Sequence, residues 1–491
     1  MFQSTVPRAE VVITILSDST QNQLREALAE TARAHLAPAK PKKLAAVRVT
    51  RGGYFAAAAL LTFVALICLR TQRDLAALIL VGGTWTVIPL LVLTDRLSFD
   101  GDRLSRTGLS SFIARRWRGR APGIALEDIE RVEVTTLRTL RRGGNVRYRY
   151  RVELTGRGLT TAFASGGEHF RQMVQKLLPR IPDYKLDTRA CELRDHLAAV
   201  KLVRAEAARL GIAPASVLDE TSETTRNRVD KHRQTQANAD TPQDETERGR
   251  LLRKSANELR VAGCLRQSAE AFRRALLISP GDGWLIYEFA RLLKSQASAR
   301  GEARMLARAC AALRLAAMRA PANSLLLQRV GESFLEYGEP QRAAKAFRRA
   351  LEVDEQAYRA QLGLAEVALS QGKLAHVIHH YNEATRIAPD KATARMARSE
   401  ADYYARLNDD EDYLAAELRR MNWLEGAGRV QRLTARLSFA ALLIALLGSS
   451  VDQVVASMGW AFASSAIIGW SGSLITRRLL SDRGRAEAGE A

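Results

Sequence analysis

The apolar positions of this 491-residue chain follow three different patterns. The first is an uncharged apolar run of about the length that a helix needs to cross ~30 Å of hydrocarbon. It occurs at Gly52–Leu69, Leu75–Thr94, Leu437–Val451 and Val454–Ile475. The second pattern alternates apolar and polar residues between positions 96 and 178, which predicts antiparallel strands. In the third pattern, between positions 251 and 388, apolar residues recur at the spacing of a helix. The sequence thus predicts two pairs of apolar helices, a small sheet and a long helical array.

The first pair of apolar runs, residues 52–94, predicts a transmembrane hairpin. Its short connecting loop holds only two cations, Arg70 and Arg73, whereas both outer flanks are richer in arginine and lysine. Because cytoplasmic loops carry the excess of these residues, both flanks are expected in the cytoplasm. A buried helical hairpin of a globular domain is the alternative, since the first run is short and rich in alanine.

The second pair, residues 435–478, is bordered by arginines and has a turn near Asp452 without lysine or arginine, so both of its flanks are also expected in the cytoplasm. Leu437–Val451 is short for a full crossing, so a shallow or re-entrant hairpin competes with a spanning one. Ala461, Ser465 and Gly469 recur every four residues on the last helix. Such a small-residue face suits close helix packing within the hairpin, with the first hairpin or between subunits.

The alternating pattern is clearest in one strand, where apolar residues are separated by charged ones. Its apolar members are Tyr148, Tyr150, Val152 and Leu154. The stretch Leu126–Ile129 precedes a strand, and an amphipathic helix, Glu168–Leu178, closes the region. A membrane hairpin, an antiparallel sheet and one C-terminal helix in this order resemble the bacterial pleckstrin-homology-like (PH-like) membrane proteins over residues 95–185. The resemblance implies a PH-like fold and specifies no lipid pocket.

Arginines of this sheet region gather in its loops, near the second apolar run. They are Arg115, Arg116, Arg118, Arg120, Arg138, Arg141 and Arg142. Each such residue near an anionic leaflet contributes about 1 kcal/mol of attraction, so a basic collar that faces anionic lipids is one interpretation. A solvated surface that follows the positive-inside bias is the other.

Four segments flank or separate these parts. Residues 1–51 hold a short strand, a helix and a basic flank, and their start lacks the features of a cleaved signal. Residues 186–212 read as one helix, and residues 213–248 are polar and lack aromatic residues, which predicts a flexible linker. Residues 479–491 form a short C-terminal tail.

The helical array has an internal repeat. Ala316, Ala350 and Ala384 share one phase, and both intervals between them are 34 residues. Each unit has a bulky residue three positions before this phase and a small residue early in its first helix, which together allow close helix packing. The bulky residues are Phe272, Leu313, Phe347 and Tyr381, the small ones are Ala256, Ala290, Gly331 and Ala365, and the turn glycines are Gly263, Gly338 and Gly372. This pattern resembles tetratricopeptide repeats.

The resemblance implies an α-solenoid of about four repeats over residues 249–390, with a degenerate repeat or capping helices over residues 391–434. The second unit is longer than the others, and its extra turn is expected near Gln296–Glu302. A generic alanine-rich helical bundle is the alternative. Because such arrays serve as binding scaffolds, the resemblance implies protein binding without naming the partner.

The family's geometry also implies that the first helix of each repeat lines a groove. The partner-binding residues expected there are Arg250, Arg253, Asn257, Arg260, Trp284, Tyr287, Arg291, Lys294, Gln328, Glu332, Arg359 and Glu366. Arg253 and Asn257 resemble a pair with which some repeats hold a terminal carboxylate, although Arg291 and Leu325 replace other members of that clamp. The early end of the groove is expected to be cationic, with converging and uncompensated positive charges, and to favour an acidic or extended segment.

Composition points to acidic partners and away from catalysis. The formal net charge is +21, which favours anionic lipids, acidic protein segments or nucleic acid, although no nucleic-acid-reading motif accompanies it. The four cysteines show no paired spacing, and no phosphate loop, nucleophile elbow or paired zinc motif occurs. His376, His379, His380 and Glu383 share a helix face at ligand spacing, but that face is expected to be solvated. No enzyme activity, cofactor or metal is therefore expected.

Together these features predict a multidomain α+β membrane protein with two transmembrane hairpins, a PH-like antiparallel sheet domain and a solenoid of tetratricopeptide repeats. The leading hypothesis is a scaffold or adaptor at the bacterial inner membrane, with its soluble domains in the cytoplasm, that recruits a cytoplasmic protein. A structural subunit of an envelope-assembly or transport complex is one alternative. A membrane tether for nucleic acid, suggested by charge alone, is the other.

Overall fold

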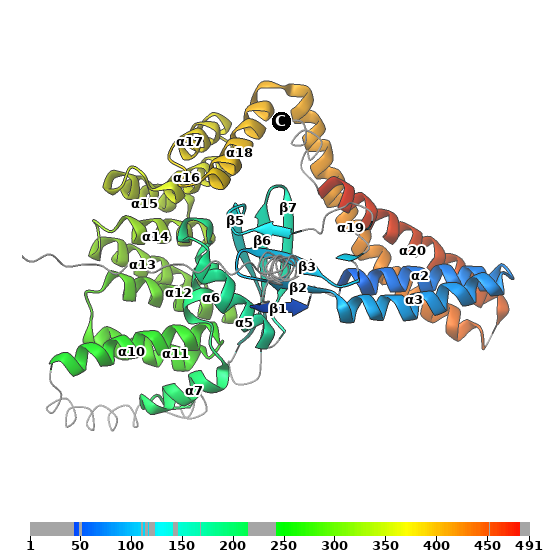
Figure 1. Cartoon of the computed structure of the whole chain (residues 1–491), viewed down its shortest axis with the longest axis horizontal. Helices are drawn as coiled ribbons and strands as arrows, with labels where there is room; N and C mark the ends of the chain where they lie inside the picture. The colour runs from blue at the N-terminus through cyan, green and yellow to red at the C-terminus, as the bar shows by residue number, and fades with distance from the viewer. Residues whose placement is uncertain are drawn as a thin grey trace, which may run out of the picture. The chain divides into compact units, whose positions relative to one another are not determined.

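Two antiparallel sheets, a stack of paired helices and two pairs of apolar helices make up the part of the chain that the structure describes (Figure 1). The structure is a computed structural model, and it describes residues 44–48, 52–109, 111–112, 116, 123–140, 146–166, 168–214, 242–450 and 452–481. The elements from Ala45 onward belong to one unit. The strand and helix expected near the N-terminus, residues 215–241 of the expected linker and the tail from residue 482 lie outside the described residues.

The first sheet has four strands in the order β1-β2-β3-β4, each antiparallel to its neighbour. The strands are β1 (Ala45–Arg48), β2 (Arg96–Phe99), β3 (Arg103–Thr107) and β4 (Gly123–Ala125). Strand β1 precedes the first apolar helices and β2 follows them, so the helical pair is an insertion between two paired strands. The sequence reading assigned this stretch only to a basic flank, because a four-residue strand is too short to display a period of two.

The second sheet has the order β5-β6-β7, also antiparallel. Its strands are β5 (Arg131–Leu140), β6 (Val146–Gly156) and β7 (Leu159–Ala164). The predicted alternation in β6 is confirmed, since Val152 and Leu154 are fully buried while the arginines between its apolar residues are exposed. Gly158 takes a φ of +67° in the β6–β7 turn, a conformation that favours glycine.

Both sheets share one apolar core, which helix α5 (Glu168–Leu177) closes through Phe170, Val174 and Leu177. The short helices η1 (Leu178–Arg180) and η2 (Asp183–Lys185) follow. These seven strands with their closing helix are called the sheet domain below. Its PH-like resemblance stays a prediction.

The single helix expected over residues 186–212 is two helices in the structure, α6 (Thr188–His196) and α7 (Val200–Arg209). The two helices pack into different hydrophobic cores, and the helical backbone is interrupted between them. Leu193 of α6 packs into the sheet domain, whereas Val203 of α7 packs with the first helical pair of the array and covers its end.

The array consists of four consecutive helical pairs (Figure 1). They are α10 (Pro242–Val261) with α11 (Leu265–Ile278), α12 (Gly283–Arg300) with α13 (Ala303–Arg319), α14 (Ser324–Glu336) with α15 (Pro340–Val353), and α16 (Tyr358–Ser370) with α17 (Leu374–Arg386). A glycine in the left-handed region turns the chain within each pair: Gly263, Gly301, Gly338 and Gly372. Helix α12 has 18 residues where α14 and α16 have 13, so the extra turn of the second unit lies where the sequence placed it.

Of the predicted bulky packing residues of the repeats, Tyr381 is half-buried and the other three are fully buried. Phe272, Leu313 and Phe347 are fully buried, as are the phased alanines Ala316, Ala350 and Ala384. Together with the 34-residue spacing and the glycine turns, this packing gives the chain helical repeats that are like tetratricopeptide repeats.

Helix α18 (Lys391–Asp409) packs on α17 and covers the other end of the array. Helix α19 (Glu411–Gly448) then runs for 38 residues, about 57 Å, from the array into the apolar region without a break. Helix α20 (Gln453–Ser481) returns along it, and α2 (Gly52–Arg70) and α3 (Asp74–Thr94) form the other apolar pair.

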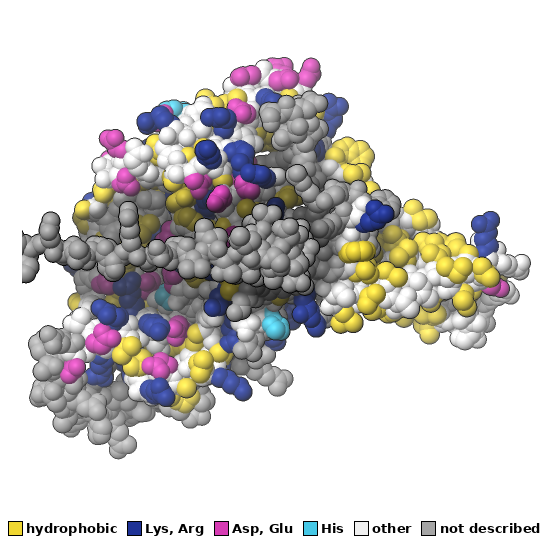
Figure 2. Space-filling view, in the orientation of Figure 1, with side chains coloured by type: hydrophobic (Ala, Val, Ile, Leu, Met, Phe, Trp, Pro, Cys, Tyr) yellow, Lys and Arg dark blue, Asp and Glu magenta, His cyan; other side chains and the backbone are white. Residues whose placement is uncertain are grey.

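Three helices among the described residues are long and apolar enough to cross a membrane: Asp74–Thr94, Glu411–Gly448 and Gln453–Arg477. Helix α2 contributes a shorter apolar segment, Ala57–Arg70. Figure 2 shows hydrophobic side chains gathered on the outside of the apolar helices, while charged side chains are spread over the repeats. Exposed apolar residues on these helices include Leu75, Leu78 and Phe439.

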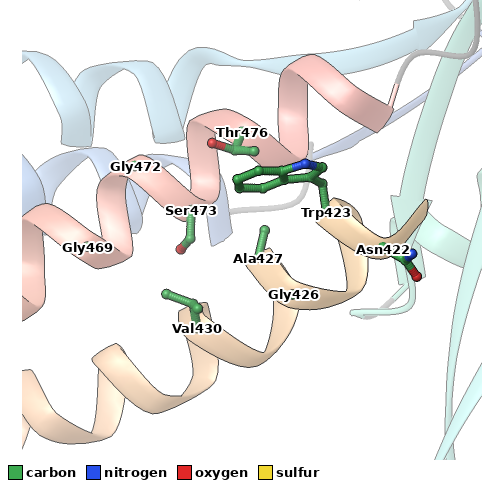
Figure 3. A pocket seen from close by; sticks show the side chains of 9 residues that line it. All are labelled: Asn422, Trp423, Gly426, Ala427, Val430, Gly469, Gly472, Ser473 and Thr476. Atoms are coloured by element: carbon green, nitrogen blue, oxygen red, sulfur yellow. The ribbon is translucent and has the colours of Figure 1, made fainter. Parts of the chain in front are cut away.

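An apolar crevice of ≈490 Å³ separates α19 from α20 near their charged ends (Figure 3). Trp423 and Val430 of α19 face Gly469, Gly472 and Ser473 of α20 across it. Nearer the turn the helices approach closely, because a Cβ on Gly459 would lie 2.6 Å from the backbone nitrogen of Ala445.

Candidate partner-binding groove

One side of the array is lined by the first helices of the four pairs, α10, α12, α14 and α16, which contact one another in order. This surface is called the groove below. Helix α6 lies against it and contacts both α10 and α14 (Figure 1). The groove that the sequence predicted for a partner is therefore occupied, in this structure, by a helix of the same chain.

One carboxylate of α6 binds two arginines of the groove. Oε1 of Glu192 lies 2.8 Å from Nε of Arg291, and Oε2 lies 3.1 Å from a terminal nitrogen of Arg260. Both arginines are only 5% exposed. Burial alone raises the pKa of Glu192, but the two guanidinium groups lower it by more, so its pKa lies well below the usual range. The pair of arginines thus holds a fully ionised carboxylate at neutral pH.

Two further residues of α6 bind glutamates of α14. Thr188 donates its hydroxyl to Glu332, and Arg189 donates to Glu336 at 2.7 Å. Glu336 also accepts from Arg291; burial raises its pKa, yet Arg291 and Arg189 lower it to about 2. Helix α6 therefore meets the groove with a hydroxyl, a cation and a carboxylate within five residues.

The segment just before α6 continues this contact toward the last repeats. Arg359 donates to Glu332 at 2.6 Å and to the backbone oxygen of Asp183 at 3.2 Å. Lys185 lies 2.7 Å from Asp390, the residue that caps α18. The segment Asp183–His196 consequently follows the groove past more than one repeat.

Asp187 ties this segment to the sheet domain. Its carboxylate accepts from the backbone nitrogens of Val134 and Ala190, at 3.0 and 2.6 Å. Burial raises the pKa of Asp187 to about 6 despite these hydrogen bonds. The residue therefore caps α6 and joins it to β5 at once.

The expected carboxylate clamp is already engaged within the array. Arg253 donates to both oxygens of Glu288, at 2.8 and 2.7 Å, and Asn257 donates to the same carboxylate at 2.7 Å. Arg253 also lies 3.2 Å from Asp282, which caps α12. Glu288 thus provides the carboxylate that the sequence reading expected from a ligand.

The other predicted groove residues have varied positions. Tyr287 is 6% exposed and belongs to the core of the array. The ring of Trp284 contacts its ring edge-on, with the two ring centres 5.9 Å apart. Lys294 lies over the ring of Tyr337, 4.8 Å from its centre. Gln328 is buried and donates to Ser324, while Glu366 lies 3.8 Å from Arg131 of β5. Arg250 is 77% exposed and pairs with Glu247 on its own helix.

The expected excess of uncompensated positive charge in the early groove is not found. Arg260 and Arg291 share Glu192, and Arg253 is paired with Glu288. Repeat phase alone does not identify Glu288, which lies four residues after Trp284 and three before Arg291 on the same face of α12. That spacing was the available signal. No local signal announces Glu192, which is 99 residues from Arg291.

A pocket of ≈530 Å³ remains between α6 and the early groove. Its lining includes Arg250, Lys254, Trp284, Leu325 and His196. Nδ1 of His196 is buried without a hydrogen-bond partner, and burial lowers the pKa of this imidazole. Open volume thus adjoins the occupied part of the groove, beside exposed cations and an aromatic ring.

The sequence also contains the predicted membrane-surface arginines and a histidine cluster on the second helix of the last repeat. Arg116 is exposed, while Arg115, Arg118, Arg120, Arg141 and Arg142 lie outside the described residues. On α17, Nδ1 of His380 lies 2.9 Å from the side-chain oxygen of Gln361. Across the described ranges, no group of three or more His, Cys, Asp or Glu residues is arranged to hold a metal ion.

No protein-family profile and no curated protein matches the chain. Among solved structures, it is similar to TTC0263, a thermophilic TPR protein of Thermus thermophilus, at 20% identity over 31% of this chain and 80% of that one, with a TM-score of 0.27. YrrB, described as a TPR protein with an unusual peptide-binding site, is 16% identical over 34% and 90%, with a TM-score of 0.25. The MamA protein is 16% identical over 33% and 95%, with a TM-score of 0.25. Because these scores are low, the repeat assignment rests on the packing described above.

Proposed function

We propose that this protein is a scaffold of the bacterial inner membrane that recruits a cytoplasmic protein through its repeat groove. The observation that carries the proposal is the docking of α6, because it is a helix bound by side chains of α10, α12 and α14. A surface that binds one helix through buried ion pairs has the chemistry to bind another. The proposed role is binding, without catalysis.

Membrane anchoring is supported by the apolar helices and by charge. Three helices have the required length and apolar character, and leucines such as Leu75 and Leu78 are exposed on α3. The excess of arginine and lysine beyond both helical pairs favours a cytoplasmic position for the sheet domain and the repeats. Arg116 and its neighbours in sequence would then attract anionic lipids.

The continuity of α19 supports a direct mechanical link between array and membrane. One helix carries the chain from Glu411, beside the cap of the array, to Gly448 at the apolar turn. On α20, Ala461 and Ser465 remain exposed while Ala463 is fully buried. The small-residue face is therefore free of α19 at these two positions and would suit contact with a second copy.

The experiment uses the exposed edge of the groove, so that the buried ion pairs with α6 are preserved. Arg250 and Lys254 line the remaining pocket with side chains that are 77% and 68% exposed. The full-length double variant Arg250→Glu, Lys254→Glu should insert into membranes normally and lose proteins that crosslink to the wild type in intact cells. Arg348→Glu, Arg349→Glu, at exposed positions on α15, is the matched control and should keep them. Equal capture by both variants would contradict recruitment through the groove.

A further inference from the structure

Helix α6 has two faces that belong to different parts of the protein. Ala190 and Leu193 are buried in the core of the sheet domain. Thr188, Arg189 and Glu192 point to the groove and bind it through hydrogen bonds and ion pairs. The helix is therefore a structural part of the sheet domain whose polar face reaches into the repeats.

The rest of this contact combines polar and apolar groups. Tyr150 donates its hydroxyl to the backbone oxygen of Val261 at 2.8 Å, and Arg395 of α18 lies 2.9 Å from Glu130. Apolar contact concentrates near the ends of the array, at Val146 beside the first pair and at Tyr184 beside the last. Domains whose interface is not a large hydrophobic one are expected to move relative to one another.

We propose that α6 is an intrachain occupant of the groove and that the partner protein replaces it with an acidic helix of its own. The inference rests on the proposed function and names the class of partner. The partner's carboxylate takes the position of Glu192 between Arg260 and Arg291.

The contacts of α6 define what such a helix carries. A glutamate or aspartate is required between the two buried arginines, since an empty position removes the carboxylate that they share. Glu332 and Glu336 of α14 favour a hydroxyl four residues before this acid and a cation three residues before it. These are the positions that Thr188 and Arg189 have relative to Glu192. The recognised pattern is hydroxyl, cation, any two residues, then acid, on one helix face.

Competition within the chain follows from this geometry. While α6 is docked, the groove is available to a partner only for the fraction of time in which α6 is released, and the apparent affinity falls by that fraction. Loss of α6 contacts therefore raises the affinity for an external acidic helix. Salt weakens both binding events, since each depends on ion pairs.

A labelled synthetic peptide of residues 183–196, with Cys191→Ser to prevent oxidation, serves as the probe. It is titrated into the detergent-solubilised full-length protein as wild type and as Glu192→Ala. The variant is expected to bind the peptide about tenfold or more tightly than the wild type, because its own α6 no longer fills the arginine pair. A peptide that also carries Glu192→Lys is the control and should bind neither protein.

A second variant covers the case in which Glu192→Ala folds poorly. Thr188→Ala, Arg189→Ala removes contacts to Glu332 and Glu336 and leaves Glu192 in place. It should also bind the peptide more tightly than the wild type, by a smaller factor. Hydrogen exchange should show faster exchange in α6 for both variants, with the β5–β6 core of the sheet domain unchanged.

Two results would overturn the inference. Equal binding to wild type and variants places the peptide outside the groove, and no binding to folded variants with a released α6 shows that an acidic helix is not the ligand. If the peptide fails while cellular proteins still crosslink in a manner that depends on Arg250 and Lys254, the proposed function stands and only the class of partner is wrong. If the wild type also forms no crosslinks that depend on Arg250 and Lys254, the proposed function itself fails.

Discussion

Gly331 of α14 lies against the ring of Phe347 on α15, so closely that a Cβ on Gly331 would come within 2.5 Å of Cε1. Gly363 of α16 approaches the same ring from the next pair, where a Cβ would lie 2.3 Å from Cζ. Phe347 is fully buried between them. The ring is thus held by two glycines, one in its own helical pair and one in the following pair.

Gly331→Ala should destabilise the array, because Gly363 prevents Phe347 from moving away from the added methyl group. The expected loss is about 1–3 kcal/mol, seen as a lower melting temperature by circular dichroism. Gly281→Ala is the control, since no atom lies within 4 Å of its Cβ position. Adding Phe347→Leu to Gly331→Ala should cost less than the sum of the single changes. A strictly additive double variant would contradict the packing argument.

The repeats could be predicted because their packing has a period. Gly331 and Phe347 were identified from phase alone, and the structure places them in contact. The role of Gly363 was not predicted. The repeat pattern places the small residue of this helix at Ala365, two positions later. Strand β1 was missed for a different reason: it is four residues long and is stabilised by β2, which lies beyond two intervening helices.

The contents of the groove could not be predicted in the same way. Repeat geometry identifies which residues line it, but the docking of α6 depends on ion pairs between residues far apart in sequence. A nine-residue helix with glutamate, arginine and threonine is as consistent with a solvated surface as with a bound one. The expectation of an acidic segment in the groove has a counterpart in the structure, although that segment belongs to the chain itself.

Trp284 and Tyr287 are expected to respond differently to truncation. Tyr287 is buried in the core of the array, so Tyr287→Ala should lower its stability by about 3–5 kcal/mol, by analogy with other large aromatic truncations. Trp284 lines the pocket and is half-buried against the same core, so Trp284→Ala should cost less stability than Tyr287→Ala. Chemical unfolding followed by circular dichroism distinguishes them. Equal losses would place Trp284 in the core as well.

The stability of the sheet domain should depend on the protonation of Asp187. Its folded pKa is raised to about 6 by burial, while Arg359 lowers and Glu332 raises it by smaller amounts. In the unfolded chain the pKa is about 3.9, so the folded state binds the extra proton between roughly pH 4 and 6. This group's contribution to stability therefore falls as pH rises through that window.

Asp187→Asn removes this titration and should flatten the dependence of unfolding free energy on pH between about 4 and 6. Glu336 acts in the opposite sense: its folded pKa is lowered to about 2, so its contribution is present above about pH 4.3 and is lost as pH falls. Glu336→Gln should therefore alter the acid limb below about pH 4. An unchanged profile for Asp187→Asn between pH 4 and 6 would show that Asp187 is ionised throughout.

The topology of the apolar helices can be tested with single cysteines in a background without the four native ones. Thr71→Cys, in the exposed turn between α2 and α3, and Asp452→Cys, between α19 and α20, should both react with an impermeant thiol reagent in intact spheroplasts. Thr434 of α19 lies against Gly469 of α20. The neighbouring arginines of α19, Arg432 and Arg436, therefore lie beside an apolar part of α20. If Thr71→Cys reacts and Asp452→Cys stays protected, the second pair is shallow and the four-span arrangement is wrong.

Glu192 and Arg291 should be strongly coupled in a double-mutant cycle. Glu192→Ala leaves two buried guanidinium groups without their shared carboxylate, and Arg291→Ala removes a partner from both Glu192 and Glu336. Each single change should destabilise the docked state by about 3–5 kcal/mol, the usual effect of removing one partner from a buried pair. The double variant should lose about 0.5–3 kcal/mol less than the sum of the two, measured by unfolding of the full chain.

The control cycle uses Arg250 and Glu247, whose side chains are 77% and 58% exposed and 3.4 Å apart. Exposed pairs of this kind contribute only about 0–1 kcal/mol, so their coupling should be close to zero and should shrink further in salt. The buried pair should lose less of its coupling in salt, because the side chains of Arg291 and Glu192 are only 5% and 18% exposed. A coupling of Glu192 with Arg291 no larger than that of the exposed pair would show that α6 spends most of its time outside the groove.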